Sequence, residues 1–314
     1  MKIYLITSNP AITDAIKNDL EKLGDFVAIN AQKMTTEDVI SKAGDVDILI
    51  AGSSGIEKIS REMLQGLKNL KMIATLTVGV AWIDIEAVKE QGITVCNIKG
   101  ANAESVAEHT WAMILDLAKR VTEFDRDVRN KGSFRFAEYT GKEVYGKTIG
   151  IIGLGDIGKK VARIAKAFDM RIIGLNQSGK PVGGIEVVDK ETLLQESDVI
   201  VTTVPLTDQT TNMISDKEIE FMKEGVILVN PAMESITDRE AVLRGLESGK
   251  IFGFGIETEI MKPVSKDSPY FKHSRVIVTP HNAFNTVDAN INTYELAVAN
   301  VKSYLKGSPQ NVVR

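Results

Sequence analysis

Three glycines in the stretch GKTIGIIGLGDIGKKVARIAKAFDM have the spacing of a phosphate-binding loop. Gly153, Gly155 and Gly158 form a G-x-G-x-x-G motif directly after an apolar, β-type run and directly before a helix-type segment. In such a setting the first glycine permits a tight turn, the second lets the backbone approach a pyrophosphate, and the third lets helix and strand pack closely. The amides and the dipole at the helix N-terminus bind the phosphates. The motif predicts dinucleotide binding, with Asp156 and Ile157 inside the loop.

The next β-type run, RIIGLN, predicts which dinucleotide binds. An NAD site usually offers an acidic side chain to the adenosine ribose at this point. Here the chain has Asn176, followed by Gln177, Ser178 and Lys180. A neutral amide, a hydroxyl and a cation tolerate a 2′-phosphate that a carboxylate would repel, so the sequence favours NADP over NAD. The alternative is an ordinary polar β-turn whose lysine points into solvent.

The strands and helices that position these loops are predicted from short apolar runs that alternate with amphipathic segments. The runs are KIYLI, DILIAG, LKMIATL, ITVCNI, TIGIIGLG, RIIGLN, VIVTTV, VILVN, FGFGI and VIVTP. Strands that are apolar on both faces and separated by helix-length segments are what a parallel sheet covered by helices on both sides requires. The predicted fold class is α/β, doubly wound. One set of alternations lies before about residue 100 and another after about residue 146, which indicates two domains.

Two helices are predicted outside this alternation. The stretch ANAESVAEHTWAMILDLAKRVTEFDRDVRNKG reads as one long helix that joins the domains. The stretch VDANINTYELAVANVKSYLKG reads as a last helix with no strand behind it, so we expect it to pack back on the first domain.

Composition excludes several classes of protein. The 314 residues carry a net charge of −4 with the cations scattered, so the chain offers no basic surface for nucleic acid or anionic lipid. The single cysteine, Cys96, gives no disulfide framework and no metal quartet, and it fits a reducing compartment. No apolar run approaches the roughly 18 to 20 residues that cross a bilayer, and the N-terminus lacks the pattern of a signal peptide. We expect a cytoplasmic protein without a metal, a membrane or a nucleic-acid partner.

Several stretches in order suggest a family. They are TVGVAWIDIEAVKEQGITVCN, NAESVAEHTWAMIL, GKTIGIIGLGDIG, VPLTDQTTNMIS, VILVN and VIVTPH. Together they make most of the chain resemble the D-2-hydroxyacid dehydrogenases, the group that includes phosphoglycerate, glyoxylate and hydroxypyruvate reductases. The resemblance implies a Rossmann-type dinucleotide-binding domain, residues 101–284, inserted into a flavodoxin-like substrate-binding domain made of residues 1–100 and completed by residues 285–314. It also implies a homodimer.

The resemblance also implies positions that bind substrate and cofactor. The backbone around Ser54 and around Val78 and Gly79 matches the loops that hold a substrate carboxylate. Beyond the glycine loop and the ribose turn, the expected cofactor contacts are Val204, Pro205, Thr210, Pro231, Ala232, Glu257 and His281.

Catalysis in the family uses three side chains. An arginine binds the substrate carboxylate, a histidine gives a proton to the carbonyl oxygen, and a glutamate keeps that histidine protonated. By the resemblance His281, in TPHNAF, stands at the histidine, whereas Met233 stands at the arginine and Lys262 at the glutamate. The two remaining histidines, His109 and His273, match no catalytic position.

These replacements leave two main hypotheses, besides an ordinary D-2-hydroxyacid dehydrogenase in which the loss of rate is offset. In the first, the chain is an oxidoreductase with a rebuilt site, where Lys262 supplies the lost cation, Met233 lines an apolar substrate pocket and His281 still donates the proton. Candidate partners for this histidine are Glu234, Glu257 and Glu259. In the second, the chain binds a dinucleotide with little or no turnover and serves as a sensor or a partner protein. The sequence does not name the substrate.

Overall fold

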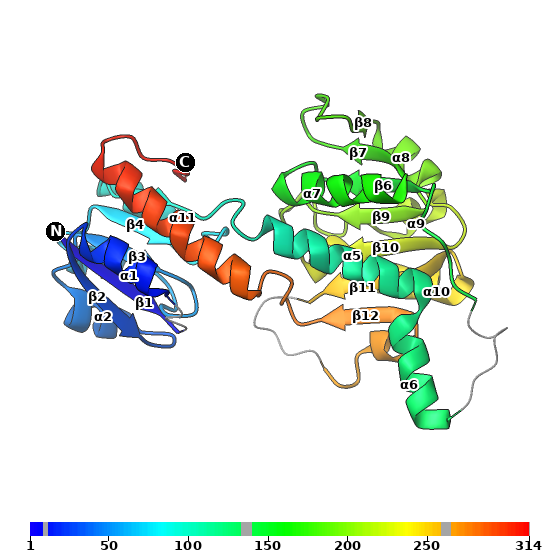
Figure 1. Cartoon of the computed structure of the whole chain (residues 1–314), viewed down its shortest axis with the longest axis horizontal. Helices are drawn as coiled ribbons and strands as arrows, with labels where there is room; N and C mark the ends of the chain where they lie inside the picture. The colour runs from blue at the N-terminus through cyan, green and yellow to red at the C-terminus, as the bar shows by residue number, and fades with distance from the viewer. Residues whose placement is uncertain (9–11, 133–139, 259–264, 314) are drawn as a thin grey trace. The chain divides into compact units, whose positions relative to one another are not determined.

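The structure is a computed structural model, in which residues 1–8, 12–132, 140–258 and 265–313 are described (Figure 1). Lys262 and Glu259 lie outside the described residues. The chain divides into two compact units: unit 1 is Met1–Asn102 with Thr286–Arg314, and unit 2 is Ala103–Asn285. These bounds lie within two residues of those expected from the sequence. None of the described helices combines the length and the apolar composition needed to cross a bilayer.

Unit 1 is built on a five-stranded parallel sheet with the order β2-β1-β3-β4-β5, which is the flavodoxin-like order. Its strands are β1 (Lys2–Thr7), β2 (Asp25–Asn30), β3 (Ile48–Ala51), β4 (Met72–Thr75) and β5 (Thr94–Cys96). Its helices are α1 (Asp14–Glu21), α2 (Thr36–Ala43), α3 (Arg61–Gly66), α4 (Ile85–Glu90) and α11 (Val287–Leu305). The last helix, α11, packs against β4 and α1, so it returns to the first unit as expected (Figure 1).

Unit 2 is built on a seven-stranded parallel sheet with the order β12-β11-β10-β9-β6-β7-β8. Its strands are β6 (Thr148–Ile152), β7 (Arg171–Leu175), β8 (Glu186–Val187), β9 (Val199–Thr202), β10 (Val226–Asn230), β11 (Ile251–Glu257) and β12 (Val276–Thr279). Six strands have the Rossmann order, and β12 adds a seventh next to β11. Two doubly wound parallel sheets were predicted, and this prediction is confirmed.

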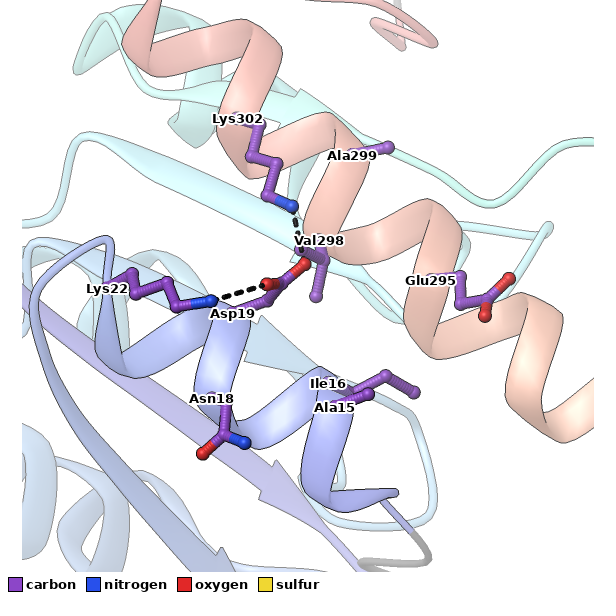
Figure 2. A pocket seen from close by; sticks show the side chains of 9 residues that line it. All are labelled: Ala15, Ile16, Asn18, Asp19, Lys22, Glu295, Val298, Ala299 and Lys302. Atoms are coloured by element: carbon purple, nitrogen blue, oxygen red, sulfur yellow. Dashed lines mark hydrogen bonds and ion pairs between the residues drawn. The ribbon is translucent and has the colours of Figure 1, made fainter.

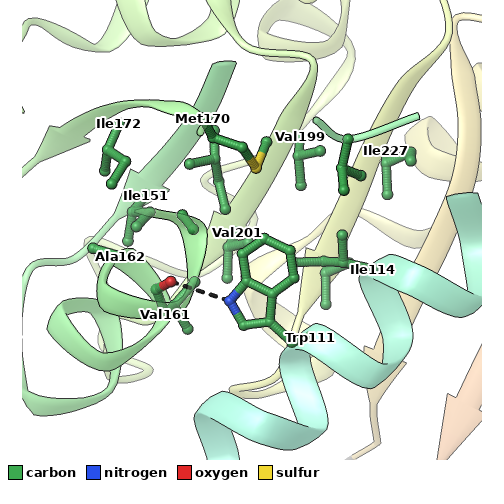
Figure 3. Close-up of a cluster of buried hydrophobic side chains, with 14 of the residues drawn as sticks. Trp111, Ile114, Ile151, Val161, Ala162, Met170, Ile172, Val199, Val201 and Ile227 are labelled. Carbon is green, nitrogen blue, oxygen red and sulfur yellow. Dashed lines mark hydrogen bonds between the residues drawn. The ribbon is translucent and has the colours of Figure 1, made fainter. Parts of the chain in front are cut away.

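The helices of unit 2 are α5 (Ala103–Lys119), α6 (Val121–Lys131), α7 (Asp156–Ala165), α8 (Lys190–Glu196), α9 (Asp216–Phe221) and α10 (Arg239–Ser248). Short 3-10 segments are η2 (Lys166–Phe168), η3 (Glu234–Ile236) and η4 (Pro269–Lys272). On α5, Trp111 anchors a buried apolar cluster (Figure 3). Its indole N–H donates to the Val161 carbonyl oxygen over 3.1 Å, and its ring stacks on Phe168 at a centroid distance of 4.9 Å. These contacts tie α5 to α7 and thereby fix two helices that border the glycine loop and the end of β12.

The prediction of one long helix over α5 and α6 is wrong. The helix stops at Arg120, whose φ of 58° is left-handed. Asp116 accepts hydrogen bonds from the Thr122 backbone N–H at 2.7 Å and from its hydroxyl at 2.6 Å, and the Arg120 guanidinium bonds to Glu123. Local side-chain bonds therefore replace the helical pattern at this point. The edge strand β2 is also absent from the predicted strands, although residues 26–29 form a short apolar run, FVAI; most side chains of this strand are exposed.

Candidate active site

Four neighbouring strands of unit 2 end in polar side chains, although the rest of each strand is apolar. In sheet order these residues are Thr279 on β12, Glu257 on β11, Asn230 on β10 and Thr202 on β9, and we call them the polar edge. Thr202 and Asn230 are fully buried, and Glu257 is 1% exposed. Buried polar groups cost free energy unless they are hydrogen-bonded. The partners of these four side chains therefore define what the edge can do.

The glycine loop lies at the end of β6, on the same side of the same sheet. Gly153 has a φ of 103°, and a Cβ there would lie 2.8 Å from the Thr203 carbonyl oxygen. A Cβ on Gly158 would lie 2.1 Å from the carbonyl oxygen of Gly153, whereas a Cβ on Gly155 would meet nothing within 4 Å. The outer two glycines are therefore required by the fold itself. The middle one leaves open space at the loop, where a pyrophosphate can approach the backbone.

The helix that follows this loop presents its amides to the same space. Gly155 is the N-cap of α7 and has no side chain to bond the first-turn N–H groups. These donors, together with the helix dipole, suit phosphate oxygens. Asp156 opens the helix, and Ile157 packs against the buried cluster beneath it. The residues present thus fit a dinucleotide.

The turn after β7 is folded by its own side chains. The Asn176 amide donates to the Lys180 carbonyl oxygen over 2.9 Å, and the Ser178 hydroxyl donates to the Asn176 amide oxygen over 3.2 Å. The Lys180 N–H in turn donates to the Ser178 hydroxyl over 3.3 Å. Gln177 and Lys180 are exposed. The turn from residue 176 to residue 180 therefore holds a fixed shape and contains no carboxylate.

A second loop lies beside the glycine loop. Val204 belongs to it, and a Cβ on Gly153 would lie 2.9 Å from the Val204 side chain. The Thr210 hydroxyl donates to the Pro205 carbonyl oxygen over 2.7 Å and accepts from the Thr207 N–H at 2.8 Å. The structure thus brings the predicted loop of Val204, Pro205 and Thr210 next to the predicted phosphate site, with Thr210 closing it.

The turn that contains Met233 is held by Asn230. The Asn230 amide donates to the Met233 carbonyl oxygen over 2.8 Å. Its oxygen accepts from the Ala232 N–H at 3.2 Å and from the Thr202 hydroxyl at 2.9 Å. Asn230 therefore fixes Pro231, Ala232 and Met233. The sequence analysis missed this role, although a polar residue at the end of the apolar run VILVN was a usable signal.

Glu234, next to Met233, is not a partner of His281. Its carboxylate pairs with Arg239, whose guanidinium nitrogens lie 2.5 and 3.0 Å from Oε1. The Arg239 guanidinium also lies 5.8 Å from the ring centroid of Tyr270. Met233 itself is half-buried. The turn therefore presents an apolar side chain and an already paired carboxylate.

His281 follows β12 with a left-handed φ of 53°. Its Nδ1 lies 3.1 Å from the Thr258 carbonyl oxygen, and its backbone N–H donates to the Thr279 carbonyl oxygen over 3.0 Å. Because a carbonyl oxygen can only accept, this contact assigns the ring proton to Nδ1. Nε2 is then the nitrogen that can exchange a proton with a substrate.

Glu257 pairs with His109 and not with His281. His109 Nε2, from α5, lies 2.9 Å from Glu257 Oε1, and the Thr279 hydroxyl donates to the same carboxylate. Burial alone would raise the pKa of Glu257, but the hydrogen bonds from His109 and Thr279 outweigh it and leave the pKa below its usual value. Of the three candidate partners of His281, Glu257 is therefore paired with another histidine. His109, which matched no catalytic position, contacts the polar edge from α5.

The predicted substrate loops lie in unit 1, after β3 and β4. The Val78 carbonyl oxygen accepts from the Asn97 amide at 2.9 Å, and the Gly79 carbonyl oxygen accepts from the Thr77 hydroxyl at 2.8 Å. Among the described residues, the N–H groups of Val78 and Gly79 donate no hydrogen bond. Ser54 is exposed in the loop after β3. With its carbonyls tied back, the Val78–Gly79 backbone has donors available for an anion.

Unit 1 also has a groove of about 430 Å³ between α1 and α11 (Figure 2). At its centre the Asp19 carboxylate lies 2.6 Å from the Lys302 ammonium and 3.6 Å from the Lys22 ammonium. Glu295 lines the same groove, so the two cations are balanced by two anions. The groove contains none of the predicted substrate residues.

Comparison with known proteins places this geometry in a family. Residues 111–283 match the model of the NAD-binding domain of D-isomer specific 2-hydroxyacid dehydrogenases. The chain is 35% identical over 280 residues to a D-3-phosphoglycerate dehydrogenase of Archaeoglobus fulgidus. The matched region covers 88% of this chain but 53% of that protein. It is also 35% identical over 292 residues to a glyoxylate reductase of Thermococcus litoralis, with 88% and 86% covered.

A solved structure agrees over the full length. An acyclic imino acid reductase, Bsp5, in complex with NADPH and D-Arg superposes with a TM-score of 0.88 and 30% identity, and all of both chains is covered. This chain spans about half the length of the phosphoglycerate dehydrogenase relative. The family model nevertheless matches more than half of the 314 residues. The chain therefore belongs to the D-isomer specific 2-hydroxyacid dehydrogenase family, as its sequence predicts.

Proposed function

We propose that the protein is an NAD(P)-dependent oxidoreductase that interconverts a 2-keto acid, or a related carbonyl compound, and the corresponding 2-hydroxy acid. The main observation behind this proposal is that a phosphate-binding loop and a histidine that can donate a proton both follow the C-terminal ends of strands of one sheet. The glycine loop follows β6, and His281, with its Nδ1 on the Thr258 carbonyl oxygen, follows β12. The names of the relatives support the same reaction class.

The chain's own residues perform the proton step. A bound nicotinamide supplies the hydride that reduces the carbonyl carbon. Protonated His281 gives its Nε2 proton to the carbonyl oxygen, while Nδ1–H stays on Thr258 and keeps the ring oriented. Two electrons and a proton at carbon, with one proton at oxygen, give the 2-hydroxy acid. Oxidation is the reverse.

Each unit, taken by itself, offers groups that suit a substrate. The backbone donors around Ser54, Val78 and Gly79 bind the substrate carboxylate. Met233, held by Asn230 through its carbonyl oxygen at 2.8 Å, contacts an apolar substrate group. Lys262 replaces the missing arginine as a point charge without its bidentate fork. Glu257 contacts the cofactor from the end of β11.

NADP is the proposed cofactor in preference to NAD. The turn from Asn176 to Lys180 has no carboxylate to repel a 2′-phosphate, and its one cation is exposed. The Bsp5 structure, which contains NADPH, supports this choice.

A homodimer in the cytoplasm is proposed from the family and the composition. In its favour, α6 buries no side chain, while Val121 and Val128 on it are 60% and 44% exposed. Exposed apolar side chains on one helix are typical of contact surfaces. The single thiol, Cys96, is buried, and burial raises its pKa to about 11, so it is unreactive in a reducing compartment.

A second candidate function is the reduction of a 2-imino acid. The turn has Met233 where the family usually has an arginine, which removes a cation, whereas the carboxylate of the neighbouring Glu234 is already paired with Arg239. A protonated carbon–nitrogen double bond is itself a cation, so this change favours it over a neutral carbonyl. Its nitrogen already carries the proton, and hydride transfer therefore needs no acid. The likeness to Bsp5 supports this candidate.

One screen separates the candidates. NADPH and NADH oxidation is followed with a panel of 2-keto acids, each with and without ammonia or a primary amine. For a keto acid, His281→Ala lowers kcat on the order of 10² to 10⁴-fold, whereas imine reduction changes much less. His273→Ala is the matched control and changes neither. Tight cofactor binding without turnover on any substrate would instead support a dinucleotide-binding protein without catalysis.

A double variant tests the assigned positions. Met233→Arg with Lys262→Glu restores the family's side chains, so we expect it to gain keto acid reductase activity. Unchanged kcat/KM for every keto acid would mean that these two positions are wrongly assigned.

A further inference from the structure

The carboxylate of Glu257 is fixed by two elements besides its own strand. The register of β11 and β12 places Thr279 opposite Glu257, and α5 packs against both strands and brings His109. His109 Nε2 lies 2.9 Å from Glu257 Oε1 and 3.2 Å from the Thr279 hydroxyl oxygen, which bonds to the same Oε1. Two donors on one oxygen prevent the carboxylate from turning. The side chain of His109 is 26% exposed, so its proton exchanges with solvent.

The second oxygen of this carboxylate, Oε2, takes no part in these two hydrogen bonds. Glu257 Oε2 is buried and makes no hydrogen bond of normal geometry among the described residues; the Ala283 backbone N–H contributes only the weakest of the contacts that lower the pKa of this carboxyl group. A buried, ionised oxygen without a donor is costly, and such a group calls for a ligand or a bound water. The end of β11 lies on the edge of the sheet that also holds the glycine loop. A donor from a bound cofactor would satisfy this oxygen.

We propose that His109 is a positioning residue for the cofactor. Its protonated ring keeps Glu257 ionised and oriented, so that Oε2 accepts a hydrogen bond from the amide group of the bound nicotinamide. Cofactor affinity then depends on the proton of His109. The inference rests on the proposed function and adds to it a residue and a pH dependence.

The expected pH dependence follows from the groups around the carboxylate. The imidazole of His109 faces the carboxylate from α5, Asn230 lies on the neighbouring strand β10, and Thr279 lies opposite on β12. His281 contacts the Thr258 carbonyl oxygen, next in sequence to Glu257. When His109 loses its proton it keeps one N–H, so the carboxylate keeps a donor but loses the positive charge. Cofactor affinity therefore falls as pH rises, without being abolished.

The test measures binding and not turnover. Dissociation constants of NADPH and NADH are measured from about pH 5.5 to 9, the range in which histidine titrates, for the wild type, His109→Gln and the control His273→Gln. Glutamine offers an uncharged N–H donor and resembles deprotonated histidine. We expect wild-type affinity to fall on the order of tenfold with rising pH. For NADH, which lacks the 2′-phosphate, the His109→Gln variant should lose the fall in affinity seen in the wild type and should match the wild-type value at high pH, while His273→Gln follows the wild type.

Proton uptake gives a second measurement that does not depend on the folding of His109→Gln. If the His109 proton favours cofactor binding, then cofactor binding must favour that proton. Proton uptake is measured by titration calorimetry of NADH binding to the His281→Gln variant in buffers of different ionisation enthalpy. NADH lacks the 2′-phosphate and the variant lacks His281, so neither group contributes protons. We expect net proton uptake at neutral pH.

The outcomes separate this inference from the proposed function. Identical pH profiles for His109→Gln and the wild type would overturn it, as would the absence of proton uptake. Cofactor binding with the expected proton linkage but without turnover would contradict the catalytic proposal and leave this inference standing. Failure to bind either dinucleotide would overturn both.

Discussion

The glycine loop and the polar edge lie at the C-terminal ends of the strands of the same sheet in unit 2, but different kinds of residue form them. At the β6 end, Gly153, Gly155 and Gly158 shape the site through the space that their missing side chains leave. At the β10 to β12 end, the buried Asn230 and Glu257 and the half-buried Thr279 are bonded to partners from other elements. The first end depends on sterics and the second on electrostatics and hydrogen bonds.

This difference determines which substitutions the glycine loop and the polar edge each tolerate. Backbone amides at a helix N-terminus bind phosphate whatever reaction follows, so the glycine loop can stay the same while the chemistry changes. The polar edge is made of buried, hydrogen-bonded side chains, so one substitution there changes the local charge and its partners. By the resemblance, Met233 stands at the position of the family's arginine at this second end, while the glycine spacing is intact.

The largest effect is expected from Gly158→Ala. The new Cβ would lie 2.1 Å from the Gly153 carbonyl oxygen, a backbone atom that cannot move without the strand. We expect the free energy of unfolding to fall by about 3 kcal/mol and tight NADPH binding to be lost. Urea unfolding and a binding titration measure both.

Gly155→Ala is the matched change, because its Cβ meets nothing within 4 Å. It should lower the free energy of unfolding by less than about 1 kcal/mol, the cost of alanine at an N-cap. It should still weaken NADPH binding on the order of tenfold or more, since the methyl group occupies space next to the phosphates. Equal destabilisation by both variants would contradict the separate roles of the two glycines.

A smaller effect is expected at the polar edge from Glu257→Gln. Its hydrogen bonds hold the pKa of Glu257 below its ordinary value of 4.5, despite burial. A carboxyl group with a depressed pKa stabilises the folded state fully above its unfolded pKa and loses this contribution as pH falls through the folded pKa. The variant should therefore be less stable than the wild type by about 2 kcal/mol at neutral pH, and the difference should shrink below about pH 4.5.

Glu247→Gln, an exposed carboxylate on α10, is the control and should change the free energy of unfolding by less than about 0.5 kcal/mol. Urea unfolding at several pH values gives the comparison. If the gap between wild type and Glu257→Gln stayed constant down to pH 3, where carboxyl groups are largely protonated, ionisation of Glu257 would not be the source of its stability.

Local patterns predicted most of the fold. Apolar, β-branched runs gave the parallel strands, and glycine spacing gave the phosphate loop, because both depend on neighbours in the sequence. The edge strand β2 was not among the predicted strands although residues 26–29 are apolar, because the run FVAI is short and is bounded by polar residues. The break at Arg120 escaped it because Asp116 and Thr122 replace the helical hydrogen bonds only once the turn has formed.

The polar edge was harder to predict, since its contacts join elements that are distant in sequence. His109 meets Glu257 only because α5 packs across β11 and β12, and no local pattern encodes that register. Thr279 meets Glu257 through strand pairing. The family resemblance assigns roles to His281, Met233 and Glu257, but it could not say which carboxylate faces which histidine.

The smallest effect is expected from Lys180→Ala, at the steric end of the site. Lys180 is exposed on a turn that Asn176 and Ser178 fold through their own hydrogen bonds, so its side chain can be removed without changing that shape. An exposed cation near a phosphate contributes little, and we expect the dissociation constant of NADPH to rise about two- to fivefold. The dissociation constant of NADH should not change.

Measurements at several ionic strengths and a control variant test whether the small change in NADPH affinity comes from the charge of Lys180. Because exposed charges are screened, the loss of NADPH affinity should shrink as ionic strength rises. Lys217→Ala, an exposed lysine on α9, should affect neither dinucleotide. An equal loss for NADPH and NADH would place Lys180 away from the 2′-phosphate, and tighter NADH binding by the wild type would reject the preference for NADP. Either result would mean that the shape of the turn, and not its charge, governs binding at this end of the sheet.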